Sequence, residues 1–130
     1  MFTEADNIEI ILPFKAEYVS VVRLTVSGIA SRMGFDIDSI EDIKVAVSEV
    51  CNKLVALGSN VAPGYKIIFS ISDKSLDIHF YCEDKSIKCI FGDGNDELGV
   101  SLISALMDDV SLCSENDYII YMSKAIEENI

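Results

Sequence analysis

The stretch V-S-V-V-R-L-T-V-S-G-I-A-S-R-M-G, residues 19–34, followed by S-I-E-D-I-K-V-A-V-S-E-V-C-N-K-L-V-A-L-G, residues 39–58, decides the fold. In both segments apolar residues recur at helical spacing, and each segment ends in a glycine. Ser39 and Asp42 stand at the spacing of a capping box, which marks the start of a helix. The pattern predicts two successive helices whose apolar stripes face one core.

Five β-rich runs surround these helices, at residues 7–12, 65–71, 76–82, 110–114 and 118–124. Pro13 follows the first run and favours a place at a sheet edge. The polar turns 72–75 and 115–117 join the other four runs into hairpins, a third helical pattern covers 98–107, and a frayed tail is expected at 127–130. The order β-α-α-β-β-loop-α-β-β predicts an α/β (α+β) two-layer sandwich. Its sheet is antiparallel or mixed and is covered by helices on one face, and residues 1–130 form a single domain.

The composition argues against several classes of protein. The chain has 22 acidic and 10 basic residues, a formal net charge of −12, which argues against binding to a nucleic-acid backbone. Half of the residues are apolar, which excludes a disordered chain. No apolar run approaches the length of a membrane span, and the first residues lack the pattern of a signal peptide. We expect a soluble cytoplasmic protein without membrane contact.

The cysteines Cys51, Cys82, Cys89 and Cys113 include no C-x-x-C pair, and His79 is the only histidine. This spacing does not fit a zinc site, so no bound metal is expected and all four thiols are predicted to be buried and reduced. We interpret His79 as a packing or surface residue rather than a catalytic base.

Two further patterns have a structural and a functional interpretation. Glu49 and Lys53 stand four residues apart on one helix face, where they form either a surface ion pair or a carboxylate beside a ligand pocket. The run G-D-G-N-D-E-L-G, residues 92–99, lacks the third glycine of a dinucleotide motif, the lysine of a P-loop and the last carboxylate of a calcium loop. Residues 83–99 carry five acids and two lysines, so a mobile acidic loop is favoured over an anion site at the following helix.

From Glu17 to Gly34, and again in I-E-D-I-K-V-A-V-S-E-V-C, residues 40–51, the chain resembles the anti-sigma factor serine kinases, above all the general-stress anti-sigma-B kinases. These bacterial proteins belong to the GHKL, or Bergerat-fold, ATPase superfamily. The resemblance runs from about Ile8 to Lys124, and L-M-D-D-V at residues 106–110 continues it. It implies a histidine-kinase-like ATPase (Bergerat) fold, with an element order similar to the one predicted above.

The first ATP-binding motif of this family has a glutamate that acts as base and, four residues later, an asparagine that binds magnesium. Glu49 matches the glutamate, but Lys53 stands at the position of the asparagine. Asn52 is the next residue, roughly 100° around the helix, and cannot take the same place. We expect the Lys53 ammonium near the place of the magnesium ion, paired with Glu49.

The other two motifs also depart from the family. The family's Asp-x-Gly, whose aspartate bonds the adenine amino group, corresponds to Cys82 and Asp84. In the glycine-rich box only Leu98 and Gly99 fit well, and the segment before it is shorter than the family's ATP lid. These changes predict a nucleotide site that has been lost.

The resemblance thus implies an anti-sigma-factor-like regulatory protein that binds a sigma factor or a related partner and needs no cofactor. The alternative is an ATP- and magnesium-dependent serine kinase that phosphorylates an anti-anti-sigma antagonist. A third possibility is a pseudokinase whose partner is unrelated to transcription. The resemblance also implies a homodimer, and it places Arg23 of the first helix in contact with the partner.

Overall fold

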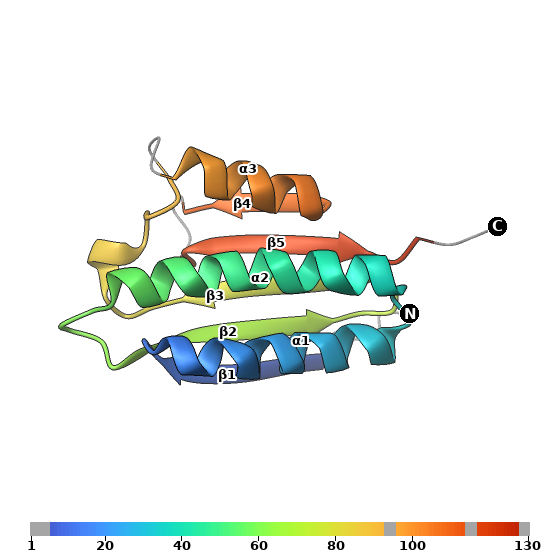
Figure 1. Ribbon diagram of the computed structural model, residues 1–130, viewed down its shortest axis with the longest axis horizontal. Helices are drawn as coiled ribbons and strands as arrows, with labels where there is room; N and C mark the ends of the chain where they lie inside the picture. Colours follow the sequence, from blue (N-terminus) through green and yellow to red (C-terminus); the bar gives the residue numbers. More distant parts are fainter. Residues whose placement is uncertain (1–5, 93–95, 114–116, 128–130) are drawn as a thin grey trace.

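The computed structural model describes residues 6–92, 96–113 and 117–127. Its elements are β1 (Asp6–Pro13), η1 (Ala16–Tyr18), α1 (Val19–Met33), α2 (Ile37–Leu57), β2 (Gly64–Ile71), β3 (Ser75–Tyr81), η2 (Lys85–Ile87), α3 (Glu97–Leu106), β4 (Asp109–Leu112) and β5 (Ile120–Ala125). The strands form one sheet in the order β1-β2-β3-β5-β4, in which all neighbours are antiparallel. The three α-helices cover one face (Figure 1). The two-layer sandwich is confirmed, with β1 at an edge and a sheet that is antiparallel rather than mixed.

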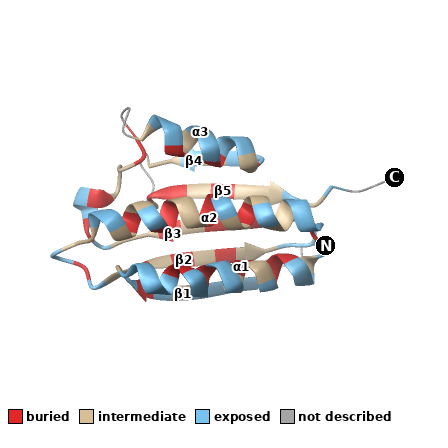
Figure 2. Ribbon diagram, in the orientation of Figure 1, coloured by how far each residue is buried: buried red, intermediate tan, exposed pale blue. Residues whose placement is uncertain are grey.

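The alternation of side chains along the strands explains the two layers. On β2 and β3 the buried residues alternate with half-buried ones, and the register places Phe69 opposite Ile78. The buried set packs against α1 and α2 in one core, as the red bands of Figure 2 show. Residues of the opposite parity, such as Lys66, His79 and Tyr81, lie on the face of the sheet that the helices leave open.

The helix ends follow local chemistry. Gly34 adopts the left-handed conformation, with φ of 98°, and ends α1 as predicted. The capping box predicted at Ser39 and Asp42 is wrong. α2 begins earlier, because the Asp36 carboxylate accepts a hydrogen bond of 2.7 Å from the Ser39 N–H and so caps the helix itself. Asp42 instead lies with its Oδ2 3.8 Å from Nζ of Lys124.

The last elements are shifted slightly from their predicted ranges. β4 starts and ends earlier than predicted, and β5 starts two residues later. Three residues of the acidic loop, 93–95, lie outside the described residues, as do most of the turn predicted at 115–117 and most of the predicted tail.

The prediction of four buried, reduced thiols is fully correct only for Cys51. A disulfide joins Cys89 to Cys113, whose Cα atoms lie 5.4 Å apart. The reason is tertiary, because the end of β4 returns beside the segment that follows η2, across 24 residues of sequence. Cys51 is free and buried as predicted, and Cys82 is free but only half-buried. In the described ranges no helix is long and apolar enough to cross a membrane.

Candidate functional site

The residues that match the family's ATP motifs come from three segments at one end of the helical layer. Glu49 and Lys53 lie in the second half of α2, Cys82 and Asp84 follow β3, and Gly99 lies in the first turn of α3. Figure 1 shows these three segments meeting at the end of the molecule where η2 is drawn. The fold therefore assembles the predicted positions into one corner.

Asp96 is the N-cap residue of α3. It adopts a left-handed conformation, with φ of 51°, and its Oδ1 accepts a hydrogen bond of 3.1 Å from the Gly99 N–H. A Cβ added at Gly99 would lie 2.5 Å from Oδ2 of Asp96, so the glycine makes room for this carboxylate. The N–H groups of a first helical turn are where an anion would bind. Here the chain's own carboxylate already bonds one of them.

Lys53 faces the same carboxylate. Its Nζ lies 3.9 Å from Oδ2 of Asp96, and the two side chains are 33% and 20% exposed. The predicted pairing of Lys53 with Glu49 is therefore wrong, because the fold brings Asp96 to the ammonium from another element. Glu49 is half-buried on the same helix, whereas Asn52 is exposed to solvent.

Asp84, which stands at a glycine position of the family, is buried and has three donors. Its carboxylate accepts hydrogen bonds from Oγ of Ser59 at 2.5 Å and from Oγ and N–H of Ser86 at 2.6 and 3.0 Å. The bond from Ser59, followed by those from Ser86, lowers the pKa of Asp84 below its usual value of 3.8. Asp84 thereby caps η2 and ties it to the chain that leaves α2.

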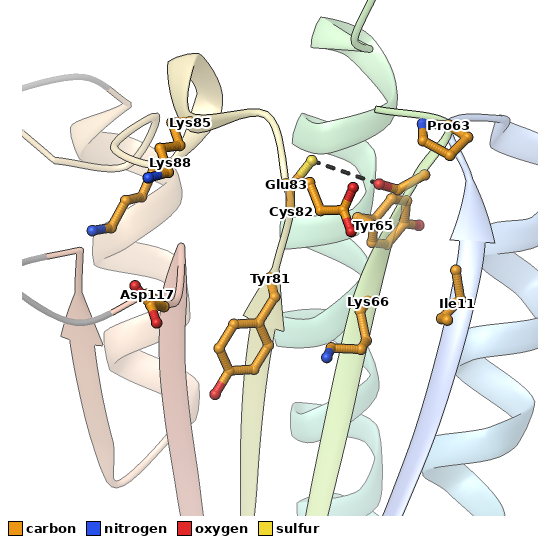
Figure 3. Close-up of a pocket in the computed structure, with 11 residues that line it drawn as sticks. Ile11, Pro63, Tyr65, Lys66, Tyr81, Cys82, Glu83, Lys85, Lys88 and Asp117 are labelled. Atoms are coloured by element: carbon orange, nitrogen blue, oxygen red, sulfur yellow. Dashed lines mark hydrogen bonds between the residues drawn. The ribbon is translucent and has the colours of Figure 1, made fainter. Parts of the chain in front are cut away.

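Cys82, which the resemblance places at the family's adenine-binding aspartate, has a thiol that bonds a backbone carbonyl. Its Sγ donates a hydrogen bond of 3.6 Å to the carbonyl oxygen of Gly64, drawn as the dashed line in Figure 3. Desolvation raises the pKa of the Cys82 thiol, so it stays protonated at neutral pH. Gly64 packs so closely on the Leu12 carbonyl that a side chain there would collide with backbone.

These residues do not fit a magnesium–nucleotide complex of the family's kind. The Lys53 ammonium, which the resemblance places at the family's metal position, lies 3.9 Å from the Asp96 carboxylate, and that carboxylate accepts the Gly99 N–H. Leu98 is 87% exposed and makes no pocket wall. Among the residues that the structure describes, no group of three histidine, cysteine or acidic side chains is placed to hold a metal ion.

The sequence prediction did not include the cap at Asp96 or the exposed aliphatic residues on α1. The cap at Asp96 could have been found, since aspartate three residues before Gly99 is a common N-cap pattern. On α1, Arg23 is exposed as predicted, and beside it Leu24 and Val21 are 75% and 46% exposed. Their positions outside the apolar stripe of α1 could have indicated that Leu24 and Val21 are exposed.

The open face of the sheet carries a groove that the sequence did not indicate. It has a volume of about 690 Å³, and its lining includes Lys66, Tyr81 and Lys85 (Figure 3). His79 lies on the same face, with its ring centre 4.7 Å from that of Tyr121, and burial lowers its pKa. His79 is thus a packing residue of this face.

Comparison with known proteins identifies the family. The model of the histidine kinase-like ATPase domain matches residues 12–124. The chain belongs to this family. Within it, the chain is similar to the serine-protein kinase RsbW of Bacillus thuringiensis (strain Al Hakam), Bacillus cereus (strain AH820) and Bacillus anthracis. Each match is 32% identical over 146 residues and covers 98% of this chain and 89% of the relative.

The fold has a counterpart among solved structures. A crystal structure of the RsbU and RsbW domains of a Mycobacterium tuberculosis protein superposes with a TM-score of 0.66 at 15% identity. It covers 93% of this chain, and the chain spans 31% of that larger protein. The likeness supports the Bergerat-type fold that the resemblance implied.

The comparisons confirm the predicted resemblance to the anti-sigma factor kinases of the GHKL superfamily. The names of the relatives fit the kinase alternative better than the predicted loss of the nucleotide site. The alignments extend over 146 positions, more than the 130 residues of this chain, so the relatives carry residues that it lacks. That the missing residues belong to the ATP lid stays a prediction.

Proposed function

We propose that this chain is an anti-sigma-factor-type regulator that binds a sigma factor or a related protein and transfers no phosphate. The observation that carries the proposal is the contact of Lys53 with Asp96 across the start of α3. A nucleotide phosphate would have to displace the Asp96 carboxylate from the Gly99 N–H and then share the site with its negative charge. Binding of the partner needs none of these steps.

The proposed partner surface is the outer face of α1. Leu24 and Val21 expose apolar area there, with Arg23 at one border of the face and Arg32 at the other, about half a helical turn around. Arginine beside exposed aliphatic side chains is a frequent anchor of protein interfaces. Gly28 adds a shallow point on this face, since a Cβ there would meet nothing within 4 Å.

The second candidate is the ATP-dependent serine kinase, with an anti-anti-sigma antagonist as substrate and magnesium as cofactor. It is favoured by the names of relatives that match nearly the whole chain. Glu49 would be its base, as the family resemblance implies. This candidate requires Asp96 and Lys53 to separate so that phosphates and metal can enter.

One pair of assays separates the candidates. The purified chain is titrated with a stress-type sigma factor, and in parallel it is incubated with labelled ATP, magnesium and an antagonist protein. We expect saturable binding and no phosphoserine. Arg23→Glu should weaken binding about 30-fold, near 2 kcal/mol, while Lys74→Glu makes the same charge reversal in the exposed turn between β2 and β3, outside α1, and changes binding little.

Every other outcome of these assays would favour a different function. Phosphoserine on the antagonist would establish the kinase, and absence of sigma binding would favour a pseudokinase with another partner. We further propose a cytoplasmic location. We also propose a homodimer, which light scattering of the purified chain at several concentrations tests.

A further inference from the structure

Cys89 and Cys113 form a covalent link that the proposed function does not use. Their Cα atoms lie 5.4 Å apart, near the middle of the range of about 4.4–6.8 Å in which a disulfide forms without backbone movement. Neither residue is buried, since both are partly exposed.

The backbone around each cysteine is held independently of the bond. The Gly92 N–H donates a hydrogen bond of 3.0 Å to the Cys89 carbonyl and closes a turn there. A Cβ at Gly92 would lie 3.2 Å from Sγ of Cys113, so the glycine leaves room for that sulfur. Cys113 follows directly on β4, whose Leu112 pairs with Ile120 of β5. The two sulfurs therefore stay close together when the bond opens.

The other two cysteines are not suited to the same chemistry. Cys51 is fully buried in α2, and desolvation raises its pKa to about 12. Cys82 is half-buried and its thiol donates a hydrogen bond to the Gly64 carbonyl oxygen. Only the thiolate attacks a disulfide, so Cys89 and Cys113 are the reactive pair.

We infer that Cys89 and Cys113 form a reversible oxidation site that exchanges with small disulfides of the glutathione class. One thiolate attacks a sulfur of oxidised glutathione, which forms a mixed disulfide and releases one reduced glutathione. The second cysteine then attacks the protein sulfur of the mixed disulfide, forms the Cys89–Cys113 bond and releases the second glutathione. The two protein thiols are oxidised, one glutathione disulfide is reduced, and the protons pass to the departing thiolates.

The bond closes a ring that contains the part of the candidate site at the start of α3. Between Cys89 and Cys113 lie Asp96, all of α3 and β4, so oxidation fixes both ends of this unit. In the reduced form the unit is held by its packing on α2 and by β4 pairing with β5. We expect the amides of α3 to open more often in the reduced form. Disulfides of cytosolic proteins are mostly transient or redox-sensing, which agrees with the location proposed above.

The test uses the full chain in buffers of reduced and oxidised glutathione at graded ratios. Free thiols are blocked with N-ethylmaleimide, and intact and peptide masses are recorded. We expect Cys89 and Cys113 to lose and regain labelling together as the ratio changes. Hydrogen exchange in α3 should be several-fold faster in the reduced form. Cys82→Ser is the matched control and should leave this transition unchanged.

Three results would overturn the inference. The pair could stay labelled at every ratio, stay closed even in fully reduced glutathione, or oxidise no more readily than Cys82. Cys113→Ser adds a check that does not depend on stability, because Cys89 should then stop at the mixed disulfide. None of these measurements depends on the sigma-factor proposal.

Discussion

The start of α3 and the outer face of α1 differ in where their side chains find partners. At the start of α3 the charged groups are matched within the chain, Asp96 by the Gly99 N–H and by Lys53. On the outer face of α1 the aliphatic residues Leu24 and Val21 are 75% and 46% exposed.

This difference separates the two proposed activities. A ligand at the start of α3 must replace contacts that exist already, so its net gain is small. A protein that covers the outer face of α1 removes apolar area from water, which gains roughly 25 cal/mol per Å². This contrast is the physical basis of our proposal that the partner binds on α1 and that no nucleotide binds beside α3.

The largest expected effect contrasts two apolar residues of α1. Val26 is fully buried, so Val26→Ala should lower the free energy of unfolding by about 2 kcal/mol through lost burial and a cavity. Leu24 is 75% exposed, so Leu24→Ala should change stability by less than about 0.5 kcal/mol yet weaken partner binding. Urea unfolding and the sigma titration measure both. A Leu24→Ala variant that binds normally would remove the outer face of α1 from the proposal.

The sequence could predict most of the fold because its signals are local. The helical spacing of α1, the glycine at its end and the alternation in β2 and β3 each depend on neighbouring residues. The start of α2 was missed because the sequence offers two possible cap residues, Asp36 and Ser39. Asp36 forms the cap, because its carboxylate reaches the N–H of Ser39, the third residue of the helix.

The candidate site was predicted less fully because its contacts join distant segments. The family resemblance located Lys53 and Asp84, but not their partners Asp96 and Ser59, which the tertiary fold brings to them. The Cys89–Cys113 bond was missed for the same reason, since no spacing rule links two cysteines that are 24 positions apart in the sequence.

A smaller effect is expected when the start of α3 is opened. Asp96→Ala removes the helix cap and puts alanine at a left-handed φ, which should cost about 1–2 kcal/mol in the free energy of unfolding. Asp96→Asn keeps the cap and tolerates this conformation, so it isolates the contact with Lys53. That partly exposed pair should contribute less than about 1 kcal/mol. Equal losses in both variants would show that the charge, and not the cap, stabilises α3.

The pH dependence of stability should report on Asp84. Its pKa is lowered in the folded chain, so its contribution is present above the usual value of 3.8 and is lost as pH falls through the lower folded value. Asp84→Asn should therefore flatten the acid limb of a plot of unfolding free energy against pH. Asp73→Asn removes the same charge from the exposed turn between β2 and β3 and serves as the control. An unchanged acid limb in Asp84→Asn would contradict the role of the serine donors.

The smallest expected effect is that of ATP with magnesium on the chain's own stability. A ligand at 100 times its dissociation constant adds about 2.7 kcal/mol to the free energy of unfolding. We expect no measurable rise, because Asp96 bonds the Gly99 N–H and Lys53 lies at the family's metal position. The triple variant Lys53→Asn, Cys82→Asp, Asp84→Gly is the comparison, and it should regain some nucleotide binding. It should still transfer no phosphate, because the Asp96 carboxylate remains at the start of α3. A saturable rise in the natural chain at micromolar ATP would instead mean that Lys53 and Asp96 part readily, and the kinase candidate would then take precedence.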